Sequence, residues 1–421
     1  MAARLLLLLI PFASLFCAVT VQATTTDLTV THAVDPARST RSWEDTLFDM
    51  FAKDNARLLY LASLATKRTS VPVASGRQTT QTANYVVRVA LGNPPQTLLM
   101  AMDTSNDAAW VPCSGCVGCS STVFDTAKSP EYKSLPCTAP QCRQLPNPTC
   151  ATTPTTCSFN LTYGSSTFSA ELAQDTLKLG PDAVPAYAFA CLRRVTGTSV
   201  PPQGLLGLGR GPLSLLSQTA ATYHSTFSYC LPSVKSSNFS GSLRLGVTGQ
   251  PVRIKTTPLL RNPRRSSLYY VNLVGIRVGR RVVDIPAAAL AFDPSTGAGT
   301  VIDSGTVFTR LVAPAYEAVR NEFRRRVNKP VTSLGGFDTC YSDPIVAPTM
   351  TLMFAGMNVT LPPDNLVIHS TAGSTTCLAM AAAPANVNSV VNVIANMQQQ
   401  NHRILFDVAN NKVGVARETC S

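Results

Sequence analysis

From residue 84 to its end, the chain is a succession of short apolar runs, each broken after a few residues by Gly, Pro or Asn. Runs such as 85–91 and 97–102 have the length of strands, and the breaks between them are typical of turns. Upstream, apolar residues recur at helical spacing from Trp43 to Ala65. With 30 Pro and 24 Gly in 421 residues, the pattern predicts one long helix over 43–65, followed by an all-β protein.

The β-rich region contains an internal sequence repeat. Tyr85-Val86 opens a first set of strands that reaches Asp103-Thr104-Ser105, and Tyr270-Val271 opens a second that reaches Asp303-Ser304-Gly305. A single Asp after a strand is commonly a turn residue. Two of them 200 residues apart, each following a hydrophobic strand and followed by a hydroxyl residue, predict two β halves and are harder to explain as turn residues alone.

The composition limits the kinds of catalytic and metal site that the chain can form. The chain is 45% hydrophobic and 14% charged, which excludes a disordered protein, and it is long enough for two domains. Its four His residues have no paired spacing, so a His-based zinc site or a Ser-His-Asp relay is not expected. Carboxylates or thiols are left to perform any chemistry, and we expect neither a metal nor another cofactor.

The N-terminus has the features of an export signal. Arg4 precedes an apolar run, and small residues end the segment at Val21-Gln22-Ala23, which predicts a signal peptide over 1–23. The apolar run is short for a membrane span, and no other run reaches the ~20 residues that a span needs. We therefore expect a secreted protein of the extracellular space or apoplast.

Residues 24–82 differ from the chain that follows because they contain no Cys and carry the predicted helix. They end in a loose polar stretch over 75–82, as expected of a processing region. We interpret 24–82 as a propeptide. The alternative, an N-terminal helix of the mature domain, stays open.

Cysteine usage agrees with export. Of 13 Cys, Cys17 lies in the signal peptide, and the even dozen that remain predict six disulfides. The spacing Cys113-x2-Cys116-x2-Cys119 also fits a metal knuckle, but no His lies near it. Asn160, Asn238 and Asn358 each begin a glycosylation sequon, which is compatible with the same route.

The net charge of +12 is partly local, because residues 251–267 contain five basic residues and no acid. They are Arg253, Lys255, Arg261, Arg264 and Arg265. A solvated linker explains them, and attraction to an acidic polymer or partner is the alternative. Nucleic acid is not expected as a partner because no aromatic residues are interleaved for base stacking.

Together these motifs resemble those of the pepsin-like aspartic proteases, and within them the plant nepenthesin-like group with a cysteine-rich insert. The resemblance covers the chain after residue 83. The matching segments are Asp103-Thr104-Ser105, Trp110, the flap Tyr163-Gly164-Ser165, Leu205-Leu206-Gly207, Asp303-Ser304-Gly305 with Thr306, Val393-Ile394-Ala395 and 396–401.

The resemblance implies an all-β, bilobal fold with a cleft between two pseudo-symmetric lobes. Residues 83–255 would form the N-terminal lobe, with the insert at 113–157, and 256–421 the C-terminal lobe, including the basic linker. We expect a monomer. The implied disulfides are Cys113–Cys116, Cys119–Cys191, Cys137–Cys157, Cys142–Cys150, Cys230–Cys420 and Cys340–Cys377.

The resemblance also implies the chemistry of a secreted endopeptidase that cleaves polypeptides at acidic pH. Asp103 and Asp303 would share a proton and activate a water for attack on the peptide carbonyl. Thr104 and Ser304 would link the two catalytic loops. Tyr163 would cover the substrate, with its hydroxyl held by the indole N–H of Trp110.

Ser105 and Asn106 depart from the family pattern, which has Gly and a hydroxyl residue after Asp-Thr. Ser105 keeps the backbone N–H but crowds the site, and Ala395 replaces a Gly beneath Asp303. The alternative function is therefore a weak or inactive pepsin-like binding protein, similar to plant xylanase inhibitors. A third interpretation is a protease that also binds DNA in an organelle, but the leader does not resemble a transit peptide. A vacuole or plastid is the alternative localisation to the extracellular space.

Overall fold

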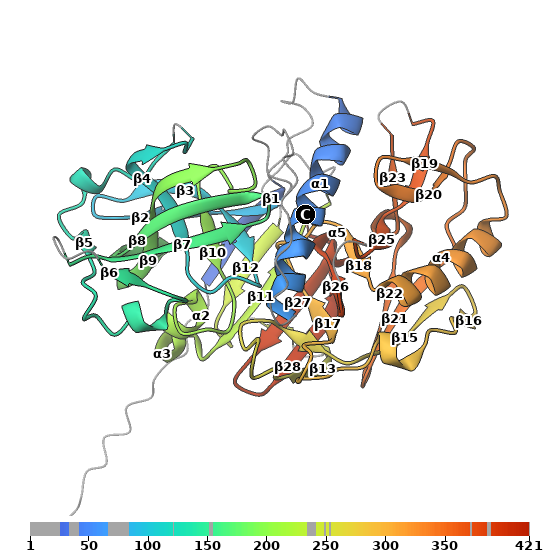
Figure 1. Cartoon of the computed structure of the whole chain (residues 1–421). Helices are drawn as coiled ribbons and strands as arrows, with labels where there is room; N and C mark the ends of the chain where they lie inside the picture. The colour runs from blue at the N-terminus through green and yellow to red at the C-terminus, as the bar shows by residue number, and fades with distance from the viewer. Residues whose placement is uncertain are drawn as a thin grey trace, which may run out of the picture.

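The computed structural model describes residues 26–32, 42–65, 84–120, 122–150, 155–233, 241–247, 250–251, 254–370, 373–384 and 389–420. The expected signal peptide, the stretch 75–82 and the sequon at Asn238 lie outside these residues. Two β lobes stand side by side, with helix α1 (Trp43–Ala65) between them (Figure 1). The predicted all-β, bilobal fold is confirmed, and α1 has the bounds of the apolar pattern. In the described part of the chain, no helix is long and apolar enough to cross a membrane.

The first lobe is built on strands that lead to Asp103. Its strands are β2 (Tyr85–Leu91), β3 (Gln96–Asp103), β4 (Trp110–Val117), β5 (Lys133–Ser134), β6 (Thr149–Cys150), β7 (Cys157–Tyr163), β8 (Ser166–Leu179), β9 (Asp182–Thr196) and β10 (Leu205–Gly207). Strand β10 runs parallel to β3, with Gly207 opposite Asp103, and is antiparallel to β4. This arrangement fixes the end of β3 inside the lobe.

The second lobe repeats the arrangement. Strand β26 runs parallel to β17, with Ile394 opposite Ile302, and antiparallel to β18. Asp303 therefore leaves its strand as Asp103 does. The strands of this lobe are β14 (Tyr270–Val271), β15 (Leu273–Val278), β16 (Arg281–Val282), β17 (Gly299–Ile302), β18 (Thr309–Leu311), β19 (Thr332–Leu334), β20 (Phe337–Tyr341), β21 (Met350–Phe354), β22 (Met357–Leu361), β23 (Val367–His369), β24 (Thr376–Leu378), β25 (Met380–Ala382) and β26 (Val391–Ile394).

A sheet of strands from both halves of the chain joins the lobes. Its strands pair in the order β1 (Thr26–His32), β12 (Gly241–Leu245), β11 (Thr226–Cys230), β27 (His402–Asp407), β28 (Lys412–Arg417) and β13 (Lys255–Leu260). Strand β1 pairs on its other side with β2. The N-terminal segment is thus fastened to the body by a strand as well as by α1.

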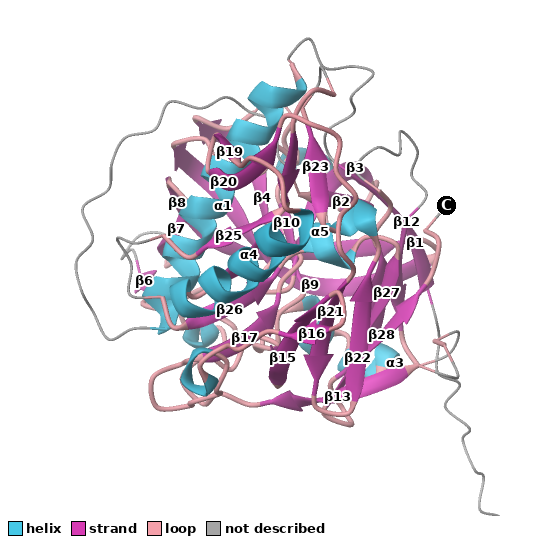
Figure 2. Cartoon of the chain, turned by 90° about the vertical axis from the view of Figure 1, so that its right-hand side faces the viewer, coloured by secondary structure: helices cyan, strands magenta, loops and turns pink. Residues whose placement is uncertain are grey.

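Helices are few in the described residues. Besides α1 they are α2 (Leu215–Gln218), α3 (Ala220–Tyr223), α4 (Ala313–Val327) and α5 (Asn396–Gln399), with 3-10 turns at 126–128, 142–144, 287–289 and 363–365. Helix α4 lies on the outer side of the second lobe, which faces the viewer in Figure 2. Its apolar side, with Tyr316, Val319 and Phe323, is buried in the core.

All twelve expected cysteines form disulfides, so the metal-knuckle interpretation is wrong. The structure pairs Cys230 with Cys420 and Cys340 with Cys377, as the resemblance implied. The other four implied pairings are wrong. The observed bridges are Cys113–Cys191, Cys116–Cys119, Cys137–Cys150 and Cys142–Cys157.

Strand geometry and burial explain these corrections. Strand β4 runs parallel to β9 with Val111 opposite Cys191, so Cys113 meets Cys191 in the core, at a Cα–Cα distance of 5.5 Å. The half-buried Cys116 and Cys119 then close their own turn. In the insert, the two buried cysteines, Cys142 and Cys157, pair with each other, which leaves the more exposed Cys137 and Cys150 as the second pair.

Candidate active site

The two aspartates of the sequence repeat meet between the lobes. Asp103 ends β3 and Asp303 directly follows β17, and their exposed fractions are 0% and 1%. The two loops approach so closely that a Cβ on Gly305 would lie 2.6 Å from Oδ2 of Asp103. Only glycine fits at this position, because any side chain there would displace the opposing carboxylate.

The hydroxyl residues that follow the aspartates hold the two loops together. The amide of Ser304 donates to Oγ1 of Thr104 at 3.0 Å, and the amide of Thr104 donates to Oγ of Ser304 at 3.2 Å. Ser304 Oγ in turn donates to the carbonyl of Met102 at 3.1 Å. These reciprocal bonds fix the relative position of the two carboxylates in advance of any ligand.

Asp103 receives several donors from its own loop. The amide and the hydroxyl of Ser105 donate to Oδ1 at 2.8 and 2.7 Å, and Nδ2 of Asn106 donates to Oδ2 at 2.9 Å. The unusual Ser105 therefore turns its hydroxyl back onto the carboxylate that precedes it. Asn106 supplies the donor that a hydroxyl residue would supply.

Asp303 receives two donors from its loop. The amide of Gly305 donates to Oδ1 at 3.1 Å, and the hydroxyl of Thr306 donates to Oδ2 at 2.6 Å. The two loops thus present equivalent amide donors, and Asn106 occupies the role that Thr306 has in the second loop. The hydroxyl of Ser105 is an additional donor with no counterpart in the second loop, where Gly305 stands.

The expected flap lies over Asp103. Tyr163 ends β7 at the β7–β8 hairpin, whose turn contains Gly164, and the adjacent Ser165 is held by Ser199 through its amide at 3.0 Å. The hydroxyl of Tyr163 donates to Oδ2 of Asp103 at 3.1 Å. The expected bond from the Trp110 indole to this hydroxyl is wrong for this structure. Instead, the rings of Trp110 and Tyr163 pack edge to face with their centroids 5.2 Å apart.

Helix α1 brings a cation to the two aspartates. Nη2 of Arg57 lies 2.8 Å from Oδ1 of Asp103, and its Nε lies 3.8 Å from Oδ2 of Asp303. Its guanidinium carbon also lies 5.0 Å from the ring centroid of Tyr163. Arg57 is 3% exposed, so it covers the carboxylates on the side of the cleft.

A second charged residue of α1, Asp54, anchors the helix to the catalytic loop of the second lobe. Its carboxylate accepts hydrogen bonds from the amides of Val307 and Phe308, which come just after Thr306. Burial raises the pKa of Asp54 to about 7, against the lowering effect of the nearby Arg310 and of the two amides. Asp54 and Arg57 lie one turn apart on the buried face of α1, so one helix face contacts both the dyad and its supporting loop.

The surroundings separate the pKa values of the two aspartates. Burial alone would raise the pKa of Asp103, but the charge of Arg57 and the hydrogen bonds from Ser105 outweigh it and lower that pKa. Burial and the negative charge of Asp103 raise the pKa of Asp303, although Arg57 acts to lower it. Asp103 is therefore the ionised member of the pair, and Asp303 is the member that holds a proton.

Comparisons with known proteins identify the family of this chain. Residues 85–247 match the family model described as xylanase inhibitor N-terminal, and 268–417 match the one described as xylanase inhibitor C-terminal. The chain is 52% identical to aspartyl protease AED3 of Arabidopsis thaliana over 398 residues, which are 92% of this chain and 88% of that protein. The chain belongs to the plant pepsin-like aspartyl proteases. This is a family of hydrolases.

Other relatives of this protease point to the same group. It is 51% identical to aspartyl protease 25 of Oryza sativa subsp. japonica, over 94% of this chain and 95% of that protein. It is 34% identical to nepenthesin-1 of Nepenthes gracilis, over 80% and 78%. Basic 7S globulin from soybean, at 19% identity, shares the fold with a TM-score of 0.68 over 94% of this chain and 98% of its own.

Several supporting residues of this protease were not identified from the sequence. Nδ2 of Asn396 donates to the carbonyl of Ser304 at 3.0 Å, and Nε2 of Gln399 donates to the carbonyl of Asp303 at 3.1 Å. From the first lobe, Nδ2 of Asn84 donates to the carbonyl of Gly305 at 3.1 Å. Residues 396–401 match the family pattern, but their sequence alone does not show that their side-chain amides hydrogen-bond to the catalytic loop.

Proposed function

We propose that this protease is a secreted aspartic endopeptidase that hydrolyses peptide bonds at acidic pH and is made as a zymogen. The observation that carries the proposal is the pair Asp103 and Asp303, buried together, held by their own loops and linked through Thr104 and Ser304. Two adjacent carboxylates with separated pKa values are suited to act as one base and one acid.

The mechanism follows from this asymmetry. Ionised Asp103 takes a proton from a water held between the carboxylates while the water oxygen attacks the scissile carbonyl carbon. Protonated Asp303 donates a hydrogen bond to the developing oxyanion and then passes its proton to the leaving nitrogen as the C–N bond breaks. After the reaction, Asp103 holds the proton taken from water and Asp303 is ionised, so the pair again carries one proton. The hydrogen bonds from Ser105 to Asp103 remain when Arg57 leaves with the N-terminal segment, and they lower the pKa of Asp103.

Latency would come from the N-terminal segment, which supports the propeptide interpretation of residues 24–82. Arg57 occupies the side of the dyad from which a peptide carbonyl would approach, and it pairs with both carboxylates. Strand β1 adds a second attachment through β12 and β2. The alternative, that α1 belongs to the mature domain, would leave the dyad permanently covered.

Export is supported by the disulfides and by the sequons. Six bridges indicate an oxidising compartment, which the extracellular space provides. Asn160 on β7 and Asn358 on β22 are exposed, so both are accessible for glycosylation. We propose polypeptides as substrates of a monomeric enzyme.

The second candidate function is a pepsin-like binding protein without catalysis. The descriptions of the two family models name a xylanase inhibitor, and Ser105 replaces the glycine of the active family pattern. Against it, both aspartates, the flap tyrosine and the loop contacts are present, and the hydroxyl of Ser105 points at its own carboxylate.

The two candidates are separated by cleavage of an unfolded protein between about pH 3 and 6, with and without pepstatin. The purified secreted protein is compared with its Asp103→Asn variant. We expect pepstatin-sensitive cleavage that the substitution abolishes. No cleavage after verified removal of the N-terminal segment would favour the binding protein.

A further inference from the structure

A cavity of about 370 Å³ adjoins the first catalytic loop. Ser105 and Asn106, which hydrogen-bond to Asp103, line one end of it, and residues 264–268 of the basic interlobe segment line another side. We call it the linker pocket. Because Ser105 and Asn106 both contact Asp103 and line the pocket, we expect a peptide cut at the dyad to place one of its side chains here, close to the scissile bond.

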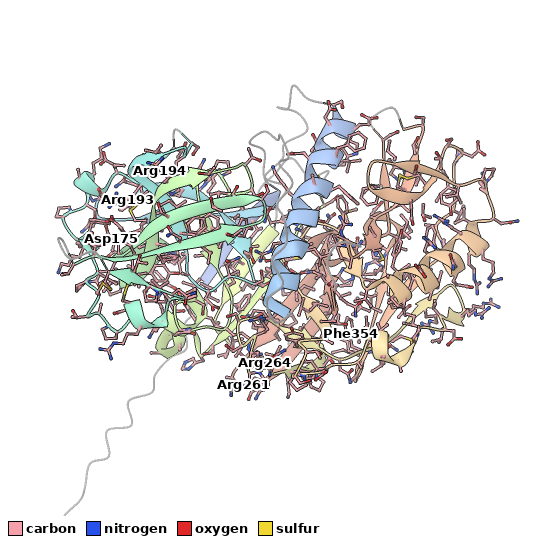
Figure 3. The ribbon with its side chains drawn as sticks, viewed as in Figure 1. Asp175, Arg193, Arg194, Arg261, Arg264 and Phe354 are labelled. Atoms are coloured by element: carbon pink, nitrogen blue, oxygen red, sulfur yellow. A yellow bond between two sulfur atoms is a disulfide. The ribbon has the colours of Figure 1, made fainter. Side chains whose placement is uncertain are left out.

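Helix α1 runs beside the linker pocket. Leu58, the residue after Arg57, packs in one buried cluster with Leu268, which lines the pocket. In the view of Figure 3, Arg264 lies near the lower end of α1, where the two lobes meet, and Arg261 lies below it. A chain that follows the path of α1 past the dyad therefore passes the linker pocket.

One wall of the linker pocket is apolar. Leu145, Phe159 and Leu161 contribute from the cysteine-rich insert and β7, and Leu213 contributes from the loop before α2. These side chains suit the methylene stem of a substrate residue, because they shield it from water. The cationic part of the lining consists of Arg264 and Arg265, next to Ser266.

The positive charge of Arg264 is not balanced by an acid. Its Nη1 donates to the carbonyl of Ser295 at 2.8 Å, a neutral acceptor, and none of the described carboxylates forms an ion pair with it. Asp107 is the one carboxylate among the described residues of the lining. Its two oxygens accept hydrogen bonds from the amide of Gly211 at 2.7 Å and the hydroxyl of Ser267 at 2.5 Å, and burial raises its pKa, which favours its neutral form at acidic pH.

From the cationic side and the apolar wall we infer that Arg264 is a specificity-determining residue, and that it selects substrates with a glutamate or aspartate in the linker pocket, close to the scissile bond. The inference rests on the proposed proteolytic function. A glutamate fits best, because its stem passes the apolar wall while its carboxylate reaches the guanidinium. Arginine is suited to this contact since its planar fork matches a carboxylate.

The test uses peptide pairs that differ only by Glu or Gln at one position on either side of the cut. It is run on acid-treated protein at about pH 5.5, where a glutamate of pKa about 4.3 is mostly ionised. At one position we expect a preference for Glu of about five- to tenfold in kcat/KM, as an exposed charge-assisted contact provides. Arg264→Gln should reduce this ratio to about one, and Arg264→Lys should keep part of it.

The matched control is Arg261→Gln, which removes an exposed charge from the same segment outside the linker pocket. This variant should leave the Glu-to-Gln ratio unchanged. Arg264→Glu should instead prefer a third peptide, with Lys at the same position, over the Glu peptide. An unchanged ratio in Arg264→Gln, or an equal loss in Arg261→Gln, would overturn the inference. If no peptide is cleaved, proteolysis fails as the function, and the Glu-to-Gln ratio in peptide binding, measured by fluorescence anisotropy, still decides the role of Arg264.

Discussion

Arg57 and Asp103 form a buried ion pair across the cleft, with Nη2 and Oδ1 2.8 Å apart. Arg57 lies in the N-terminal segment that we propose is removed, whereas Asp103 is a catalytic residue of the mature enzyme. The charge of Arg57 lowers the pKa of Asp103 and acts to lower that of Asp303. Proton uptake by the dyad therefore weakens the docking of α1, and acid favours its release.

Asp54 is expected to oppose this release. Its pKa rises from 3.8 to about 7 when α1 is docked, so at a pH between these two values Asp54 binds a proton as α1 docks. This contribution to docking is complete below pH 3.8 and is lost as the pH rises through about 7. The wild type should therefore hold α1 down to a lower pH than Asp54→Ala, which also leaves two buried amides without acceptors, at ~1–3 kcal/mol each.

The measurement for Asp54 is the rate of conversion of the full-length protein as a function of pH. Lys53→Ala is the control, because it removes a neighbouring charge that pairs with Asp49 along the same helix. If Asp54→Ala converts at the same pH as the wild type, Asp54 has no part in holding the helix.

Ser105 is expected to set the acidic limit of activity. Its hydrogen bonds lower the pKa of Asp103, so Ser105→Gly should raise that pKa. The acid limb of the profile of kcat/KM against pH should then move to higher pH, since Asp103 must be ionised to accept a proton. Ser105→Ala, which loses the hydroxyl but keeps the β-carbon, should show the same shift. A shift to lower pH in both variants would contradict this role of Ser105.

The disulfide between Cys113 and Cys191 should matter more for stability than the neighbouring turn disulfide. It is buried and spans 78 residues, whereas Cys116–Cys119 spans 3. From chain entropy, loss of the first should cost about 4.5 kcal/mol and loss of the second about 2 kcal/mol. Thermal unfolding of the two double Cys→Ser variants compares them, and peptide mapping without reduction checks the pairing. A Cys119–Cys191 peptide would contradict the structure.

Much of the fold could be predicted because it depends on local patterns. The helix over 43–65 shows in its apolar spacing, and the repeated Asp after a hydrophobic strand shows in the two halves. The pairing of Cys113 with Cys191 could not be predicted, because it depends on β4 and β9 lying side by side in parallel register. Sequence spacing does not contain that information.

The catalytic aspartates could be identified from their motifs, but the role of Arg57 could not. The sequence does show that Asp54 and Arg57 interrupt the apolar face of α1 that Leu47, Met50 and Leu58 define. A charged residue on such a face indicates a buried partner. Which partner it meets depends on how the helix lies against both lobes, and this is a tertiary relationship.

The most direct test of the account compares cleavage by three full-length proteins at about pH 6 without an acid step. They are the wild type, Arg57→Ala and the double variant Arg57→Ala with Asp103→Asn. We expect the wild type to be inactive, Arg57→Ala to release α1 more readily and so cleave the substrate, and the double variant to be inactive again, because the cation holds α1 over a dyad that needs Asp103. Cleavage by the double variant, or a fully active wild type, would contradict the account.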